Sequence, residues 1–148
     1  WNTINVKSMK QMFQNTDYNG AVNVWDVDNV EDMSSMFAGN STFNRDISVW
    51  NVENVKNMSG MFYDATSFDY NVAYWNFSSI EDMSLFMSTH QYDTNFYTDL
   101  LEVLDDSGVT NVVLDMDETY YLGSASSNRS SLVAKGWTIT DKGVSGGI

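Results

Sequence analysis

The chain has 148 residues, of which 43% are hydrophobic, so it suits one folded domain and is unlike a disordered segment. Twenty acidic against seven basic residues give a formal net charge of −13, and because such a surface repels phosphate backbones, nucleic acid is excluded as an expected partner. The absence of cysteine excludes disulfides and thiolate metal sites, and no apolar run approaches the roughly 20 residues of a membrane span.

The first 88 residues carry one apolar phrase four times. Each copy opens on a tryptophan, continues through a valine or isoleucine and ends on Met-x-x-[Met/Phe]-[Phe/Met]. Successive copies start 24, 25 and 25 residues apart, at Trp1, Trp25, Trp50 and Trp75. Self-similarity at such a period is typical of solenoids, because no single unit buries its own apolar face and stacked units share one core. The repeat therefore predicts that the tryptophans are core residues.

The repeat also predicts its own secondary structure. Met33, Met36 and Phe37 have the i, i+3, i+4 spacing of one helix face, and Asp32 before them is a good N-cap. Residues 47–52 (ISVWNV) have the L-x-x-L-x-L rhythm of a leucine-rich repeat, in which alternate residues point inward from a short strand. We therefore expect one short strand near each tryptophan and one or two helical turns near each Met-Met-Phe.

Two stretches of the repeat resemble a known family. Residues 36–50 (MFAGNSTFNRDISVW) and 61–65 (MFYDA) are similar to the repeats of the BspA-like leucine-rich-repeat family of bacterial surface proteins. The ending at residues 132–141 (LVAKGWTITD) also looks like the close that such proteins carry. The resemblance covers roughly residues 1–90. It implies an extracellular adhesion or interaction module, and it implies no catalytic residue.

A different unit follows residue 88. Helical spacing, apolar runs and glycine stops predict four elements there: a helix from Asp93 or Thr94 to Gly108, a strand over 109–114, a helix over 124–135 and a strand over 137–139. The predicted fold class is an α/β repeat, namely a leucine-rich-repeat-like solenoid with one short strand and one short helix per coil, plus a small α/β C-terminal cap. The predicted domains are the solenoid (1–88), the capping unit (89–143) and a flexible tail (144–148).

Four acidic residues are candidates for metal binding. Asp26 and Asp28 form one D-x-D pair, and Asp115 and Asp117 form another. Neither pair continues into the D-x-[DN]-x-[DN]-G pattern of an EF-hand calcium loop. Solvated turns are the default interpretation of such pairs. We therefore expect no cofactor, with Ca²⁺ at these pairs as the exception to test.

Catalytic motifs are weak. Residues 143–147 spell G-x-S-x-G, but a nucleophile elbow needs a strand before the serine and a helix after it, for which the motif lies too close to the end. His90 is the single histidine and lies between the repeats and the next unit, where a surface or capping role is expected. No pair of carboxylates stands out for glycoside hydrolysis. We therefore predict that the chain is not an enzyme.

Residues between the repeated columns are available for contacts. Arg45 and Tyr70 share one repeat position, and Tyr63 and Tyr74 occupy two others. Because Tyr and Arg are favoured at binding hot spots, these four residues are the contact-patch candidates. Four N-x-[S/T] sequons are candidate glycan acceptors: Asn40, Asn57, Asn76 and Asn128.

Stacking would also create a ladder of charges and an open edge. One repeat position alternates in sign through Lys7, Glu31, Lys56 and Glu81, so stacked coils would set opposite charges side by side. In the first coil, the apolar residues have a neighbour on one side only: Ile4 or Val6, Met9, Met12 and Phe13. Such an edge is expected to be covered, either by further repeats or by another copy.

The expected function is therefore recognition. We predict an extracellular or cell-surface, non-catalytic adhesion module that binds a protein or glycan surface, without nucleic acid and without a membrane span. The alternative is a structural subunit of a filament, surface layer or virion appendage, at the virion surface in the last case, that self-associates through its N-terminal coil. A carbohydrate-active enzyme is a remote further alternative.

Overall fold

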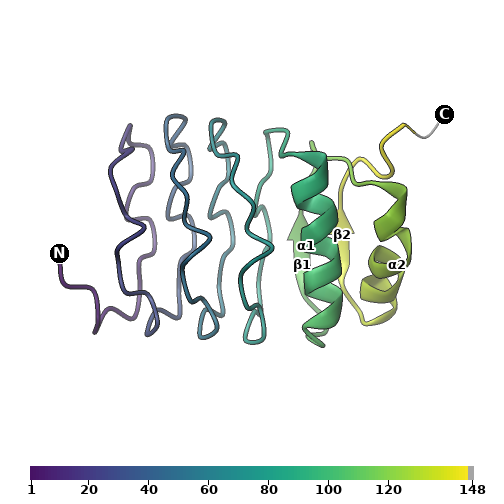
Figure 1. The fold of residues 1–148 in the computed structure, drawn as a ribbon, viewed down its shortest axis with the longest axis horizontal. Helices are drawn as coiled ribbons and strands as arrows, with labels where there is room; N and C mark the ends of the chain where they lie inside the picture. The colour runs from purple at the N-terminus through teal and green to yellow at the C-terminus, as the bar shows by residue number, and fades with distance from the viewer. Residues whose placement is uncertain (147–148) are drawn as a thin grey trace.

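The structure is a computed structural model that describes residues 1–146, and its helices and strands all lie after residue 93 (Figure 1). They are helix α1 (Thr94–Asp106), strand β1 (Val113–Asp115), the 3-10 helix η1 (Gly123–Ala125), helix α2 (Ser126–Ala134) and strand β2 (Thr138–Thr140). We call residues 1–92 the loop stack, because their turns lie side by side along the long axis, and residues 93–146 the terminal unit. Within this range, no helix combines the length and the apolar composition that a membrane crossing needs.

The predicted fold class is wrong. Residues 1–93 contain turns and isolated bridges but no helix and no strand, so they lack both elements that the repeat predicts for each coil of a leucine-rich-repeat-like solenoid. In the described residues, β1 and β2 form a single two-stranded parallel sheet. The observed architecture is therefore a set of irregular loops joined to a small α/β unit with an open sheet.

A left-handed residue between the two methionines of each loop explains why no helix forms there. A helix needs negative φ at every residue, and a left-handed conformation costs an L-residue roughly 1–2 kcal/mol. The position is nevertheless left-handed in all four loops: Gln11 (φ 58°), Ser35 (55°), Gly60 (60°) and Leu85 (55°). A second left-handed column follows four residues later: Asn15, Gly39, Asp64 and Thr89. The i, i+3, i+4 spacing therefore marks a repeated turn with buried methionines.

Backbone hydrogen bonds join each loop to the next. Alternate N–H groups of the first loop donate to carbonyls of the second at 2.8–2.9 Å: Met9 to Asp32, Gln11 to Ser34, Phe13 to Met36 and Asn15 to Ala38. The second and third loops repeat these four bonds toward the loop that follows them. We call this set of bonds the ladder. It satisfies the backbone between loops instead of within a helix or a regular strand.

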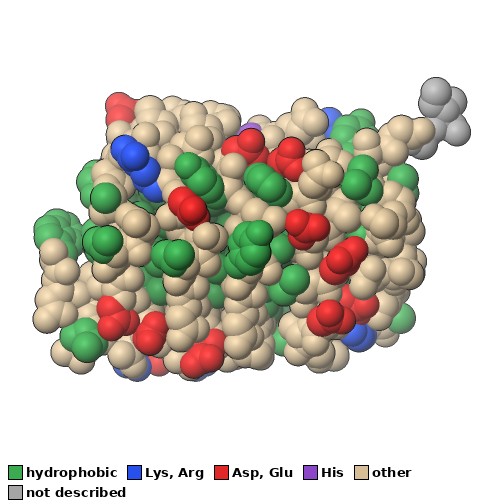
Figure 2. All heavy atoms as spheres, viewed as in Figure 1, with side chains coloured by type: hydrophobic (Ala, Val, Ile, Leu, Met, Phe, Trp, Pro, Cys, Tyr) green, Lys and Arg blue, Asp and Glu red, His purple; other side chains and the backbone are tan. Residues whose placement is uncertain are grey.

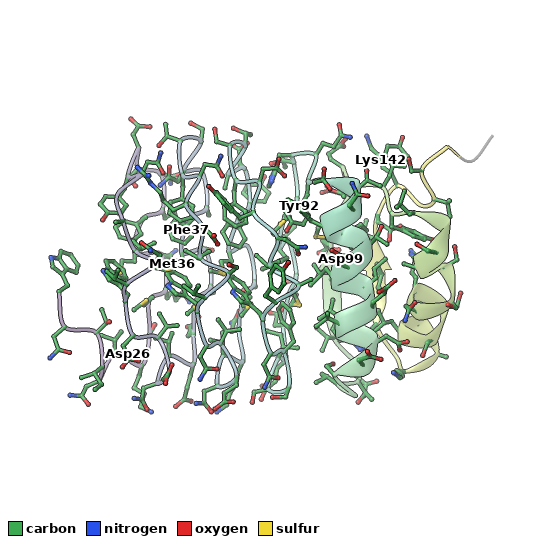
Figure 3. The ribbon with its side chains drawn as sticks, viewed as in Figure 1. Asp26, Met36, Phe37, Tyr92, Asp99 and Lys142 are labelled. Carbon is green, nitrogen blue, oxygen red and sulfur yellow. The ribbon has the colours of Figure 1, made fainter. Side chains whose placement is uncertain are left out.

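The tryptophans divide between core and surface. Trp50 is buried, and its indole N–H donates to the Val22 carbonyl at 3.1 Å; Trp75 repeats this contact one loop later at 3.0 Å. The prediction of a core role is confirmed for these two. It is wrong for Trp1, which is 90% exposed and stacks at 5.7 Å on the half-buried Trp25. Deeper in the stack, Phe37 packs against a second phenylalanine ring within its own loop, and Figure 3 labels Phe37 and Met36 in this interior.

The predicted charge ladder forms over its first three members. Glu31 lies between two lysines, with its carboxylate 3.4 Å from the Lys7 ammonium and 3.0 Å from that of Lys56. These contacts, led by the bond from Lys56, hold the pKa of Glu31 below its usual value. Among the described residues, no ion pair joins Lys56 to Glu81. All three paired side chains are largely exposed, so they contribute more to register than to stability.

The terminal unit replaces the next loop. Met83 forms a parallel bridge with Leu114, so β1 takes the position that a following loop would occupy, and β2 pairs with the other edge of β1. Asp93 begins α1, because its carboxylate accepts the first free N–H groups of the helix. Figure 1 shows α1 in front of the two strands and α2 at the outer end.

Candidate recognition surface

The most exposed apolar side chains of the loop stack beyond Trp1 occupy one repeat position. Val24, Val49 and Tyr74 each precede a tryptophan, and their exposed fractions are 80%, 70% and 77%. Three successive loops thus expose a hydrophobic side chain at the same place. We call these three residues the exposed column.

A repeated turn holds the exposed column in place. In each loop, the tryptophan N–H donates to the carbonyl three residues earlier, at 3.0 Å for Trp25 and 3.1 Å for Trp50 and Trp75. The residue before the tryptophan lies inside this turn. Because Trp50 and Trp75 point into the core, Val49 and Tyr74 remain outside it. The backbone positions the exposed column, while the core leaves its side chains free.

The four contact-patch candidates lie on two kinds of segment of the loop stack. Arg45 is exposed and its Nε donates to the Asn19 carbonyl at 2.7 Å, so its guanidinium is fixed to the neighbouring loop. Tyr70, also exposed, belongs to the segment that leads to Tyr74. Tyr63 does not, because it lies in the ladder segment, where its carbonyl accepts the N–H of Gly39 at 2.7 Å. Arg45 and Tyr70 thus accompany the exposed column in sequence, and Tyr63 is separate from it.

The loop stack and α1 are joined next to this region. The Asn71 amide donates to the Asp99 carboxylate of α1 at 2.9 Å, and the Tyr92 hydroxyl donates to the Tyr70 carbonyl at 2.6 Å. Figure 3 labels Asp99 on α1 and Tyr92 beside it. Figure 2 shows hydrophobic side chains across the loop stack on this face and acidic side chains over α1. Acidic side chains also lie over the loop stack, so both regions carry negative charge on this face.

The calcium candidates make other contacts. The Asp26 carboxylate accepts the N–H of Asp28 at 3.1 Å, which is an ordinary Asx turn, and both residues are exposed. Asp115 and Asp117 accept the N–H groups of the left-handed residues Leu85 and Thr89 at 2.9 and 3.2 Å. Within residues 1–146, no group of three or more His, Cys, Asp or Glu side chains is arranged to hold a metal ion.

Asp115 and Asp117 therefore cap the ladder. In earlier loops, the N–H at each left-handed position donates to a backbone carbonyl of the next loop. The last loop has β1 beside it, and these two carboxylates replace the missing carbonyls. The signal was present in the sequence as two aspartates two residues apart after the last repeat. The sequence predicts solvated turns there, with Ca²⁺ as the exception, and a capping role does not follow because the direction of the ladder bonds is invisible without the fold.

His90 is buried at the junction of the loop stack and the terminal unit. It is 7% exposed, and neither ring nitrogen has a hydrogen-bond partner of good geometry among the described residues. Burial lowers the pKa of His90, and the Phe68 backbone and the carboxylates of Asp69 and Asp64 oppose that shift. Of the two roles predicted for His90, surface or capping, the surface role is thus wrong, while its burial at the junction agrees with the capping role.

The sequons differ in access. Asn40 is fully buried, its amide donates to the Tyr18 carbonyl at 2.8 Å and its oxygen accepts from Phe43, so a glycan cannot be attached without breaking the loop. Asn128 lies within α2 and donates to Asp105. Asn76 is exposed in a turn, and Asn57 is half-buried on the ladder. Asn76 is therefore the most accessible acceptor of the four.

A surface groove and the G-x-S-x-G stretch are the two remaining candidate sites. A shallow polar groove of about 550 Å³ separates the last loop from the terminal unit, with Lys56, Glu81 and Ser107 among its lining residues. Of the G-x-S-x-G stretch, Ser145 donates its backbone N–H to the Tyr121 carbonyl at 2.7 Å. Gly147, like residue 148 of the predicted flexible tail, lies outside the described residues.

Comparison with known proteins gives one result. The family described as "Mycoplasma protein of unknown function, DUF285" matches residues 1–103, which are all of the loop stack and most of α1. No curated protein and no solved structure matches the chain. Since the match covers more than half of the sequence, the chain belongs to the DUF285 family.

Proposed function

We propose that this protein is a non-catalytic recognition module that binds protein or glycan surfaces outside the cell. The observation that carries the proposal is the exposed column, in which Val24, Val49 and Tyr74 leave apolar side chains in solvent in three successive loops. When a partner covers apolar surface of this kind, the free energy falls, so binding is favoured. The resemblance of the repeats to BspA-like surface proteins supports the same assignment.

The geometry of the column favours binding over a purely structural role. Its side chains contribute little to folding because they are exposed, yet the turn before each tryptophan holds them in register. Arg45 and Tyr70 add the side-chain types that are common at binding hot spots. Since Arg45 is already fixed by Asn19, it loses little conformational freedom when it meets a ligand.

The test is a binding screen with matched variants. The purified chain is applied to an array of glycans and to a panel of immobilised extracellular proteins. For any ligand found, the triple variant V24S/V49S/Y74S is expected to bind at least about tenfold more weakly, because three apolar contacts are lost. The control is L122S/V133S/V144S, which removes three exposed apolar side chains of the terminal unit. Equal loss in both variants, or no loss in the first, would contradict the proposal.

A further inference from the structure

The polar groove beside the last loop forms where a column of asparagines ends. Asn29 donates its side-chain amide to the Ile4 carbonyl of the preceding loop at 2.8 Å. One loop later, Asn54 repeats this bond to the Asp28 carbonyl, also at 2.8 Å. The next member of the column is Ser79, whose shorter side chain makes no such bond within residues 1–146 and lines the groove. The groove therefore lies where the repeat would place an amide and the chain places a hydroxyl.

Two backbone carbonyls lack a donor at this position. The Glu53 carbonyl is the acceptor that an asparagine at position 79 would reach, and the Ser78 carbonyl is the one that the next member of the column would reach. Neither carbonyl accepts a hydrogen bond from any residue between 1 and 146. Both residues are exposed, and Ser78 lines the groove, which therefore presents a free backbone acceptor.

The opposite wall of the groove is the turn that follows α1, residues 107–110. Figure 1 shows this end of α1 at the bottom of the view, away from the first and last described residues. The Ser107 hydroxyl donates back into α1 at 2.6 Å, and the Trp137 indole N–H donates to the Val109 carbonyl at 2.9 Å. Gly108 is left-handed (φ 73°), and no atom lies within 4 Å of the place where its Cβ would be. The turn is therefore held on both sides, and the space beside Gly108 is free.

The charges that line the groove cancel. Lys56 and Glu81 both line it. A second hollow of about 280 Å³ shares Lys56 and Ser79 with the groove and adds Lys7 and Glu31 to its lining. The two hollows together thus hold two lysines against two glutamates, although the whole chain carries −13. A ligand with a strong net charge of either sign is therefore not favoured there.

The polarity of the lining restricts the ligand further. Ile80 and Val109 are the apolar residues among those that line the groove, and Ile80 is buried, so an apolar ligand finds little to contact. The Lys56 ammonium has three donors, and Glu31 accepts from it at 3.0 Å. The Glu81 carboxylate has no ion-pair partner within residues 1–146. Since a hydroxyl both donates and accepts, an uncharged ligand rich in hydroxyls satisfies both kinds of group.

We propose that this groove is a second binding site, which takes an uncharged oligosaccharide. Sugar hydroxyls donate to the Ser78 carbonyl and the Glu81 carboxylate, and they accept from the Lys56 ammonium. The groove volume of about 550 Å³ lies within the roughly 300–1,000 Å³ of small-molecule sites. Because the second hollow adjoins the groove at Lys56 and Ser79, a linear saccharide can continue across the loops. The site shares no residue with the exposed column, so it goes beyond the proposed function.

Calorimetric titration of the full chain with neutral hexasaccharides tests the site. The probes are cellohexaose, maltohexaose and mannohexaose, and hexasaccharides of galacturonic acid and of heparin are their charged counterparts. Saturable binding of at least one neutral probe is expected at millimolar concentration or below, with weaker binding of both charged ones. In NMR spectra, the bound probe is expected to shift the backbone amide signals of Ser79, Gly108 and Thr110, which line the groove.

The variant Ser79→Asn extends the asparagine column into the groove. Its amide can donate to the Glu53 carbonyl, as Asn54 does one loop earlier, so the variant should melt no lower than the parent chain. Because the larger side chain occupies the groove and takes up hydrogen-bonding groups, saccharide binding should weaken about tenfold or more. The control is Ser127→Asn, the same substitution at an exposed position of α2, which should bind like the parent. If Ser79→Asn melts below the parent, Thr110→Gln narrows the groove from the other wall and should weaken binding likewise.

Four outcomes would overturn the proposal. The first is no saturable binding of any neutral probe at millimolar concentration, and the second is tighter binding of a charged hexasaccharide than of every neutral one. The third is parent-like binding by both Ser79→Asn and Thr110→Gln. The fourth is loss of saccharide binding in V24S/V49S/Y74S with binding retained in Ser79→Asn, which would place the sugar on the exposed column. That last result would support the proposed function, so failure here and failure of the proposed function are distinguishable.

Discussion

The loop stack and the terminal unit satisfy the hydrogen-bonding groups of their backbone in opposite ways. In the terminal unit, α1 satisfies its backbone locally, from its Asp93 cap to its last turn. In the loop stack, a residue donates its N–H to a residue 23 or 24 positions later, and the segments themselves are neither helical nor regular strands. Local propensity therefore matters little in the loop stack, where each loop is held by its neighbours, and matters most in the terminal unit.

The largest expected effect comes from breaking the loop stack at its core. Trp50→Ala removes a buried indole and leaves the Val22 carbonyl without its donor, so the free energy of unfolding should fall by about 3–5 kcal/mol. Urea denaturation measures this. The adjacent Val49→Ala is the control, since Val49 is 70% exposed and should cost less than about 0.5 kcal/mol. Similar losses in both variants would show that the indole is not a structural centre.

The next effect lies at the junction of the two regions. Asp115→Ala leaves the N–H of Leu85 without an acceptor and should lower the free energy of unfolding by about 1–2 kcal/mol. Asp115→Asn keeps an acceptor oxygen and should lose less. Addition of Ca²⁺ or EDTA should leave the melting temperature of the parent chain unchanged. A clear rise in melting temperature with Ca²⁺, abolished by Asp115→Asn, would restore the metal interpretation.

A glycine should act with opposite sign in the two regions. Leu85 is left-handed and 51% exposed, so Leu85→Gly relieves backbone strain and should stabilise the chain by up to about 1 kcal/mol. Val133 is similarly exposed but lies within α2, where Val133→Gly should destabilise by a few tenths of a kcal/mol or more. Thermal melts of both variants give the comparison. Destabilisation by both would mean that Leu85 is not strained.

The smallest expected effect depends on pH. Burial lowers the pKa of His90 below its ordinary 6.5, although Asp69 and Asp64 oppose the shift. Because the unfolded chain binds the proton more readily, His90 contributes stability that is complete above about pH 6.5 and is lost as the pH falls toward the lowered folded pKa. His90→Gln should flatten the dependence of the melting temperature in that window. An unchanged slope would mean that the carboxylates, and not His90, cause the pH dependence of the melting temperature.

The sequence predicted which residues belong to the repeat, the burial of Trp50 and Trp75 and the neighbours of Glu31. All three follow from residues that recur in register. The sequence also indicated α1, whose cap and apolar spacing are local. The helix predicted over residues 33–37 does not form, because the sequence gives no sign that Ser35 is left-handed. The sequence also missed the exposure of Val24 and Val49, because a valine beside a core tryptophan has no sequence mark that separates inside from outside.

The four ladder bonds between each pair of loops share one direction, whereas Glu31, Lys56 and Glu81 donate their N–H groups back to the preceding loop, so the loop stack keeps a net electrostatic axis. Aligned N–H···O=C groups add as they do in an α-helix, with a partial positive charge where N–H groups emerge and a partial negative charge where carbonyls emerge. The chain places carboxylates, Asp115 and Asp117, at the positive end and two lysines, Lys7 and Lys10, in the loop at the negative end. This is the charge arrangement of a well-capped helix, reproduced across loops about 24 residues apart. Removing or inserting one whole middle loop would therefore change the length of the axis and leave both of its ends intact.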